Sequence, residues 1–109
     1  MRACLLAMLA VIIGLIGTPA HAASDCTDEA AALVKEETDL PRLEVVSPRD
    51  PPPYCITLET IIAFSRRLAM HVEHCPGSAY ASAAGGWSKT RTDYARLFAR
   101  HGCRRAIPN

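Results

Sequence analysis

Cysteine and histidine are the residues of this chain whose types and spacing could support redox or metal chemistry. The 109 residues include five cysteines, and Cys4 lies in the apolar N-terminal stretch. The other four, Cys26, Cys55, Cys75 and Cys103, contain no C-x-x-C motif, which is the arrangement typical of thioredoxin-like exchange. An even number of cysteines in a short exported chain is typical of structural disulfides. We therefore expect two disulfide bonds.

A metal site is the second chemistry that the spacing allows. His71 and His74 lie three residues apart and directly precede Cys75, so on a helix both imidazoles could reach one ion. A structural zinc site needs four ligands, and we expect Cys75 to be oxidised. We therefore predict no metal ion and no cofactor.

Hydrolytic catalysis is the third possibility. The sequence contains no G-x-S-x-G, H-E-x-x-H, P-loop or G-x-G-x-x-G motif. Nothing in the sequence places a histidine beside Ser78, Ser82 or Ser88. We predict no catalytic residues and a protein that is not an enzyme.

Charge is distributed unevenly along the chain. Residues 23–63 carry nine acidic and three basic side chains, whereas residues 64–109 carry eight basic and two acidic ones. We favour compensation of Arg100 and Arg104 by the acidic end of the first helical segment. That acidic end consists of Glu36, Glu37 and Asp39. The alternative is weak binding to an anionic surface by a basic patch of Lys89, Arg91, Arg96, Arg100, Arg104 and Arg105.

The first 22 residues have the composition of a secretory signal peptide. Arg2 precedes an apolar run that ends before Gly17, and Ala20-His21-Ala22 has the A-x-A form of a cleavage site. The apolar run is shorter than the roughly 20 residues of a membrane span. We predict a signal peptide at 1–22 and one domain at 23–109. The expected location is periplasmic or secreted, with no transmembrane segment after cleavage.

The first part of the predicted domain combines a helix with a proline-rich connector. Apolar residues recur at helical spacing after Ser24 or Asp25. This helix should end before Pro41, because a residue that precedes proline avoids the α conformation. Residues 41–54 contain five prolines. We expect them to form a stiff, non-helical connector, with a short extended piece at most.

Two more helices follow the connector. The second has Thr57 as its expected N-cap and ends at Pro76-Gly77, and its apolar residues form one continuous stripe. The third has Ser88 as its expected N-cap and Gly102 at its C-terminal end. The sequence therefore predicts an all-α fold, a small antiparallel three-helix bundle stapled by two disulfides.

The long middle helix restricts the disulfide pairing. Along a helix, Cys55 and Cys75 are separated by about 30 Å, whereas a disulfide requires Cα atoms within about 7 Å. Two connectivities remain: Cys26–Cys75 with Cys55–Cys103, or Cys26–Cys55 with Cys75–Cys103. Antiparallel packing of neighbouring helices favours the first, with one bridge at each end of the bundle.

Several short segments behind the signal carry a resemblance, namely SDC, DPPPYCITLE, HVEHCP, GGW and HGCRR. In this layout the chain resembles small exported proteins of host-associated Gram-negative bacteria, some of which are proposed substrates of type IV secretion. We expect a non-enzymatic periplasmic protein that binds another protein or an envelope component. The alternative is a secreted effector or virulence factor delivered to a host cell by a secretion system. No nucleic-acid partner is expected, because exported proteins seldom meet nucleic acid.

Overall fold

The computed structural model describes residues 25–106, without the side chains of residues 105 and 106. The predicted signal peptide at 1–22 lies outside the described residues. A first helix spans residues 25–38, and three further α-helices follow: α2 (Pro51–His74), α3 (Ala84–Arg100) and the short α4 (Cys103–Ala106). Two 3-10 helices lie in the connections, η1 (Leu43–Val45) and η2 (Ala79–Ala83). Residues 25–106 contain no strand.

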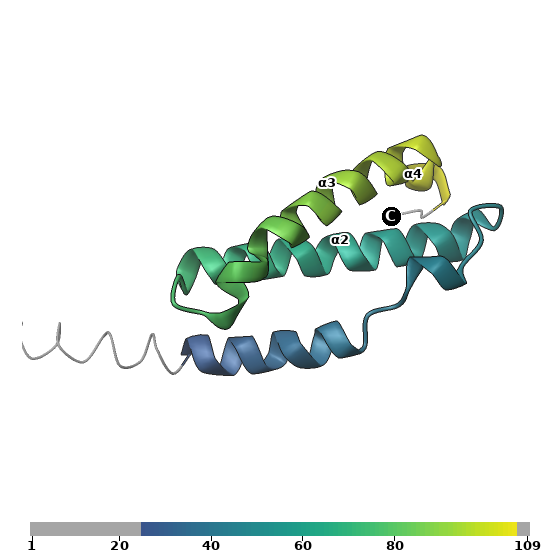
Figure 1. The fold of residues 1–109 in the computed structure, drawn as a ribbon. Coiled ribbons are helices and arrows are strands. Elements are labelled where there is room, and N and C mark those ends of the chain that lie inside the picture. The colour runs from purple at the N-terminus through teal and green to yellow at the C-terminus, as the bar shows by residue number, and fades with distance from the viewer. Residues whose placement is uncertain (1–24, 107–109) are drawn as a thin grey trace, which may run out of the picture.

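The three long helices form an antiparallel bundle (Figure 1). The central helix α2 packs against α3 on one side, and the helix of residues 25–38 runs along α2 on the other side. The connector of residues 39–50 returns the chain to the start of α2, and η2 leads from the end of α2 into α3. This arrangement confirms the predicted all-α three-helix bundle with a proline-rich connector.

The central helix begins at Pro51, six residues before the expected cap at Thr57. Two predictions are therefore wrong: that Thr57 caps the helix, and that residues 51–54 belong to a non-helical connector. Asp50 occupies the N-cap position, and Pro51 begins the helix. Proline is tolerated in the first turn of a helix, because the N–H groups of that turn have no intrahelical acceptor. The prolines after Asp50 therefore start the helix instead of forbidding it. Thr57 is a buried residue inside α2, with 6% of its surface exposed, and does not cap it.

The last long helix also begins earlier than its sequence suggests. Ser88 was the expected N-cap, but α3 starts at Ala84 with Ala83 as its N-cap. The 3-10 helix η2 leads directly into α3, so the two glycines at 85 and 86 lie within its first turn. At the C-terminal end the prediction is confirmed, because Gly102 follows α3 with a φ of 65°, the left-handed conformation that glycine adopts without steric cost.

The core is divided into two clusters along α2. One surrounds Cys55 and Leu58 near the start of α2 and includes partly buried Tyr94, Leu97 and Phe98 of α3. The other surrounds Phe64 and Leu68 and includes Leu33 of the first helix and partly buried Trp87 of α3. Leu58, Phe64 and Leu68 have no exposed surface. The apolar stripe read from the sequence is thus the contact surface of α2.

Two disulfides staple the ends of the bundle. Cys26 is bonded to Cys75, with a Cα–Cα distance of 5.9 Å, and Cys55 to Cys103, with a Cα–Cα distance of 5.3 Å. This is the predicted connectivity. Each bridge joins residues nearly fifty positions apart and therefore removes much conformational entropy from the unfolded chain.

Within residues 25–106, none of the helices combines the length and the apolar character needed to cross a membrane.

Candidate functional site

The predicted basic patch lies on α3 and α4. Arg96, Arg100 and Arg104 are exposed, and no ion pair among the described residues involves them. Lys89 is also exposed, but its Nζ lies 2.9 Å from the carboxylate of Asp93 one turn later on α3. The remaining two residues contribute less, because Arg91 is half-buried and the side chain of residue 105 lies outside the described part. Among the patch residues whose side chains are described, the exposed ones without an ion pair are therefore Arg96, Arg100 and Arg104.

The expected compensation of this charge by the first helix is wrong. Glu36 forms an ion pair with Arg67 in the middle of α2, and Glu37 accepts a hydrogen bond of 2.7 Å from the hydroxyl of Tyr80. The reason is length. The first helix extends about 20 Å from the Cys26–Cys75 end, whereas α2 extends about 36 Å. The acidic end of the first helix consequently stops near the middle of α2, far short of Arg100.

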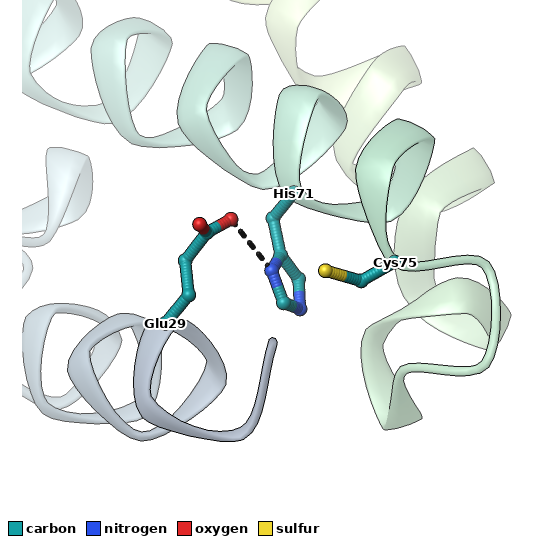
Figure 2. A group of neighbouring side chains, drawn as sticks. All are labelled: Glu29, His71 and Cys75. Atoms are coloured by element: carbon teal, nitrogen blue, oxygen red, sulfur yellow. Dashed lines mark hydrogen bonds and ion pairs between the residues drawn. The ribbon is translucent and has the colours of Figure 1, made fainter. Parts of the chain in front are cut away.

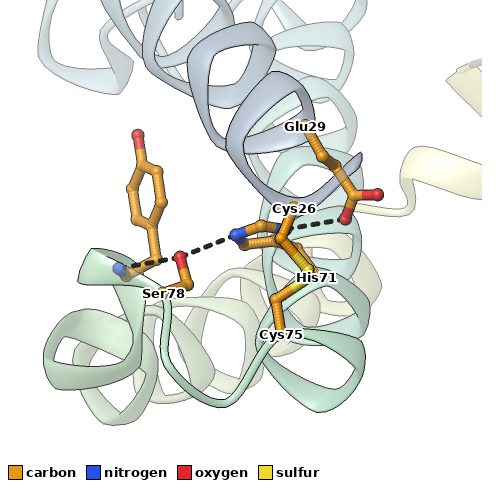
Figure 3. The surroundings of a disulfide bond; sticks show 6 residues. Cys26, Glu29, His71, Cys75 and Ser78 are labelled. Atoms are coloured by element: carbon orange, nitrogen blue, oxygen red, sulfur yellow. Dashed lines mark hydrogen bonds and ion pairs between the residues drawn. A yellow bond between two sulfur atoms is a disulfide. The ribbon is translucent and has the colours of Figure 1, made fainter. Parts of the chain in front are cut away.

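The most tightly organised polar group lies at the opposite end of the molecule, around His71. This side chain has no exposed surface. Its Nδ1 lies 2.7 Å from a carboxylate oxygen of Glu29 on the first helix, and its Nε2 lies 2.7 Å from Oγ of Ser78 (Figures 2 and 3). One buried imidazole thus joins the first helix to the turn that follows α2. Both ring nitrogens are satisfied, as burial of an imidazole requires.

The proton positions of the neutral imidazole follow from its partners. A carboxylate only accepts hydrogen bonds, so Nδ1 carries the proton and donates it to Glu29. Nε2 then accepts from the hydroxyl of Ser78. The same hydroxyl oxygen accepts the backbone N–H of Tyr80 and so caps η2.

Burial and the hydrogen bond to Glu37 raise the pKa of Tyr80 to about 12.

The Cys26–Cys75 disulfide lies beside this group (Figure 3). The bridge lines an open cavity of about 510 Å³, together with His74, Ser78 and the turn residues between them. Cys75 also donates its backbone N–H to the carbonyl oxygen of His71, at 2.7 Å. The covalent bridge and the polar group therefore hold the same end of the bundle.

Two kinds of chemistry fit the order of these side chains. Glu29, His71 and Ser78 form a hydrogen-bonded row of carboxylate, imidazole and hydroxyl, which is the arrangement of the catalytic triad in serine hydrolases. In this structure Ser78 also caps η2 and His71 has no exposed surface, so the contacts of both side chains help to fix the turn. The second chemistry is metal binding, because one potential ligand atom each of Glu29, His71 and Cys75 lies within 4.8 Å of the others (Figure 2).

Only part of this group is predicted by the sequence. The sequence pairs His71 with His74, but His74 is exposed. The sequence offers no histidine partner for Ser78, whereas in the structure Ser78 contacts His71. The missed signal is helical spacing: Glu29 is three residues after Cys26, and His71 is four residues before Cys75. Once the bridge is assumed, residues one turn away from each cysteine lie on facing sides of the two helices.

Comparison of the chain with protein-family models, curated proteins and solved structures finds no match.

Proposed function

We propose that the protein is an exported, non-enzymatic binding protein that attaches to anionic phospholipid of the cell envelope. The attachment surface is the basic face, defined as Arg96, Arg100 and Arg104. The observation that carries the proposal is that these exposed guanidinium groups have no ion-pair partner among the described residues, while Glu36 and Glu37, two of the three acids expected to neutralise them, contact Arg67 and Tyr80 instead.

The charge and spacing of this face suit a phosphate-rich surface. Arg96 and Arg100 lie one helical turn apart on α3, and Arg104 follows directly in α4. A basic side chain near an anionic membrane surface contributes about 1 kcal/mol to binding. Three such residues give weak, reversible attachment that salt screens. The Cys55–Cys103 disulfide anchors the end of the bundle that carries this face, which suits a protein that works in an oxidising compartment.

Sedimentation with lipid vesicles tests the proposal. The oxidised protein should bind vesicles that contain phosphatidylglycerol at low salt and should not bind vesicles of phosphatidylcholine alone. The double variant R96A/R100A should lose about 2 kcal/mol, roughly a thirty-fold loss of affinity. A matched control is R42A/R49A, which removes the same charge from exposed positions of the connector. Equal losses in the two double variants, or no binding by the wild type at low salt, would refute the proposal.

A further inference from the structure

We propose that reduction of the Cys26–Cys75 disulfide converts this end of the bundle into a Zn²⁺ site. The ligands are the thiolates of Cys26 and Cys75, Nδ1 of His71 and the carboxylate of Glu29. The inference goes beyond the proposed function, because no residue of the basic face takes part. Two sulfurs, one nitrogen and one oxygen make up a donor set that zinc accepts in four-coordinate sites.

The ligand atoms are already gathered in the oxidised protein. Nδ1 of His71 lies 2.7 Å from Glu29, and one atom each of Glu29, His71 and Cys75 lies within 4.8 Å of the others. The fourth ligand, Cys26, is held at Cys75 by the bridge itself. After reduction the two sulfurs need to separate to roughly 3.8 Å to share a tetrahedral ion. Rotation of two cysteine side chains supplies such a movement.

The second nitrogen of His71 has the partner that a metal-bound imidazole requires. A histidine that binds a metal usually donates its other ring N–H to a fixed oxygen, which sets the tautomer and the ring orientation. In this protein that oxygen is Oγ of Ser78, 2.7 Å from Nε2. When Zn²⁺ takes the place of the Nδ1 proton, the proton of the neutral imidazole lies on Nε2. Ser78 then accepts from the ring, which a hydroxyl can do as readily as it donates.

The two disulfides differ in their exposure to a reductant. Cys26 is partly exposed, and both sulfurs of its bridge belong to residues that line the cavity of about 510 Å³. Cys103 also lines an open cavity, but neither Cys55 nor Cys103 has any exposed surface. A soluble dithiol should therefore reduce the Cys26–Cys75 bridge while the protein stays folded. The Cys55–Cys103 bridge then continues to hold the other end of the bundle.

The redox step is an ordinary thiol–disulfide exchange. A thiolate of the dithiol attacks one sulfur of the bridge and forms a mixed disulfide. The second thiol group of the dithiol then attacks the mixed disulfide and displaces the protein sulfur. The cysteine pair gains two electrons and two protons, and the dithiol becomes a cyclic disulfide. Binding of Zn²⁺ displaces the two thiol protons. The Cys26–Cys75 end of the bundle is then held by a disulfide under oxidising conditions and by a bound metal ion under reducing conditions.

Titration with Co²⁺ and Zn²⁺ tests the site in the full mature protein. The protein is treated with dithiothreitol, the reagent is removed without oxygen, and thiol counting verifies that one bridge is open. One equivalent of Co²⁺ should then give the absorption of a tetrahedral ion with thiolate-to-metal charge transfer, and Zn²⁺ should abolish it. The oxidised protein should give no such spectrum. Charge-transfer absorption of equal strength before and after reduction would overturn the assignment.

Variants of neighbouring residues distinguish this site from loose binding by free thiols. H71A and E29Q should weaken Zn²⁺ binding, whereas H74A should not, although His74 lines the same cavity. Because H71A removes a buried side chain, E29Q provides the same test at a half-exposed position. S78A should weaken Zn²⁺ binding about tenfold, because it removes the contact between Oγ of Ser78 and Nε2 of His71. Unchanged affinity in both E29Q and H71A, or a larger loss in H74A, would contradict the site.

Discussion

His71 and Ser78 are joined by a hydrogen bond of 2.7 Å between Nε2 and Oγ across the turn that ends α2. The histidine lies in the last turn of α2 and the serine caps η2. Their contact therefore links the last turn of α2 to the 3-10 helix that leads into α3. Because Glu29 holds the other nitrogen of the ring, the position of the first helix depends on the same side chain.

Replacement of His71 should be far more damaging than replacement of His74. H71A empties a fully buried position and leaves Glu29 and Ser78 without their shared partner, so we expect a loss of about 2–4 kcal/mol in the free energy of unfolding. H74A changes an exposed position and should stay within about 0.5 kcal/mol of wild type. Urea denaturation of the oxidised proteins measures both values. Equal effects of the two changes would contradict the role given to His71.

Ser78 should contribute to stability through its two hydrogen bonds. S78A leaves the Tyr80 N–H and Nε2 of His71 without their hydrogen-bond partner, and we expect a loss of about 1–2 kcal/mol. The control S82A removes a hydroxyl that makes one exposed contact and should cost less than about 0.5 kcal/mol. Thermal unfolding of both variants checks the difference. Labelling of Ser78 by a fluorophosphonate probe would instead assign it a nucleophilic role.

Reduction of both disulfides should destabilise the domain strongly. Each bridge closes a loop of nearly fifty residues, for which the chain-entropy model gives about 4 kcal/mol. That is a large share of the roughly 5–15 kcal/mol available to a domain. Calorimetry of the mature protein in excess reductant without metal measures the change. A melting temperature that does not move would show that the bridges are dispensable.

Ionisation of Tyr80 should make the fold less stable at alkaline pH. The pKa of this hydroxyl rises from 10.0 to about 12 in the folded protein, because of burial and the contact with Glu37. A raised pKa means that the folded state favours the protonated form. The stabilisation is therefore complete below pH 10 and is lost as the pH rises towards 12. Burial also raises the pKa of Tyr94, so spectrophotometric titration should show late tyrosinate ionisation that is smaller in Y80F than in the wild type. Late ionisation of equal size in the two proteins would assign it to other tyrosines.

Gly102 should be intolerant of a side chain for conformational reasons alone. Its φ is 65°, and a Cβ atom added there would meet nothing within 4 Å, so only the left-handed backbone opposes substitution. G102A should cost about 1 kcal/mol. The control G77A has equally open surroundings without the positive φ and should not be destabilising. Chemical denaturation of both variants decides the matter, and a neutral G102A would refute the argument.

The amino-acid sequence alone predicted the helical class, favoured the observed disulfide connectivity and placed Gly102 at the end of the last long helix. The stripe of Leu58 to Cys75 has helical spacing, and a continuous helix keeps Cys55 away from Cys75 by simple length. These features depend on local periodicity and on covalent geometry, which a sequence states directly. The helix starts at Pro51 and Ala84 were missed, because the prolines after Asp50 begin α2 instead of preventing it and because the 3-10 helix η2 leads directly into α3.

Only the tertiary structure decided which polar side chains meet. Glu29, His71 and Ser78 come from two helices and a turn, and their contact requires the helices to have a particular rotation about their axes. The separation of the acidic residues from Arg100 likewise depends on how far the short first helix reaches along α2. Such distances arise from the packing of whole elements, and the spacing of residues around each cysteine indicates such contacts only once the disulfide is assumed.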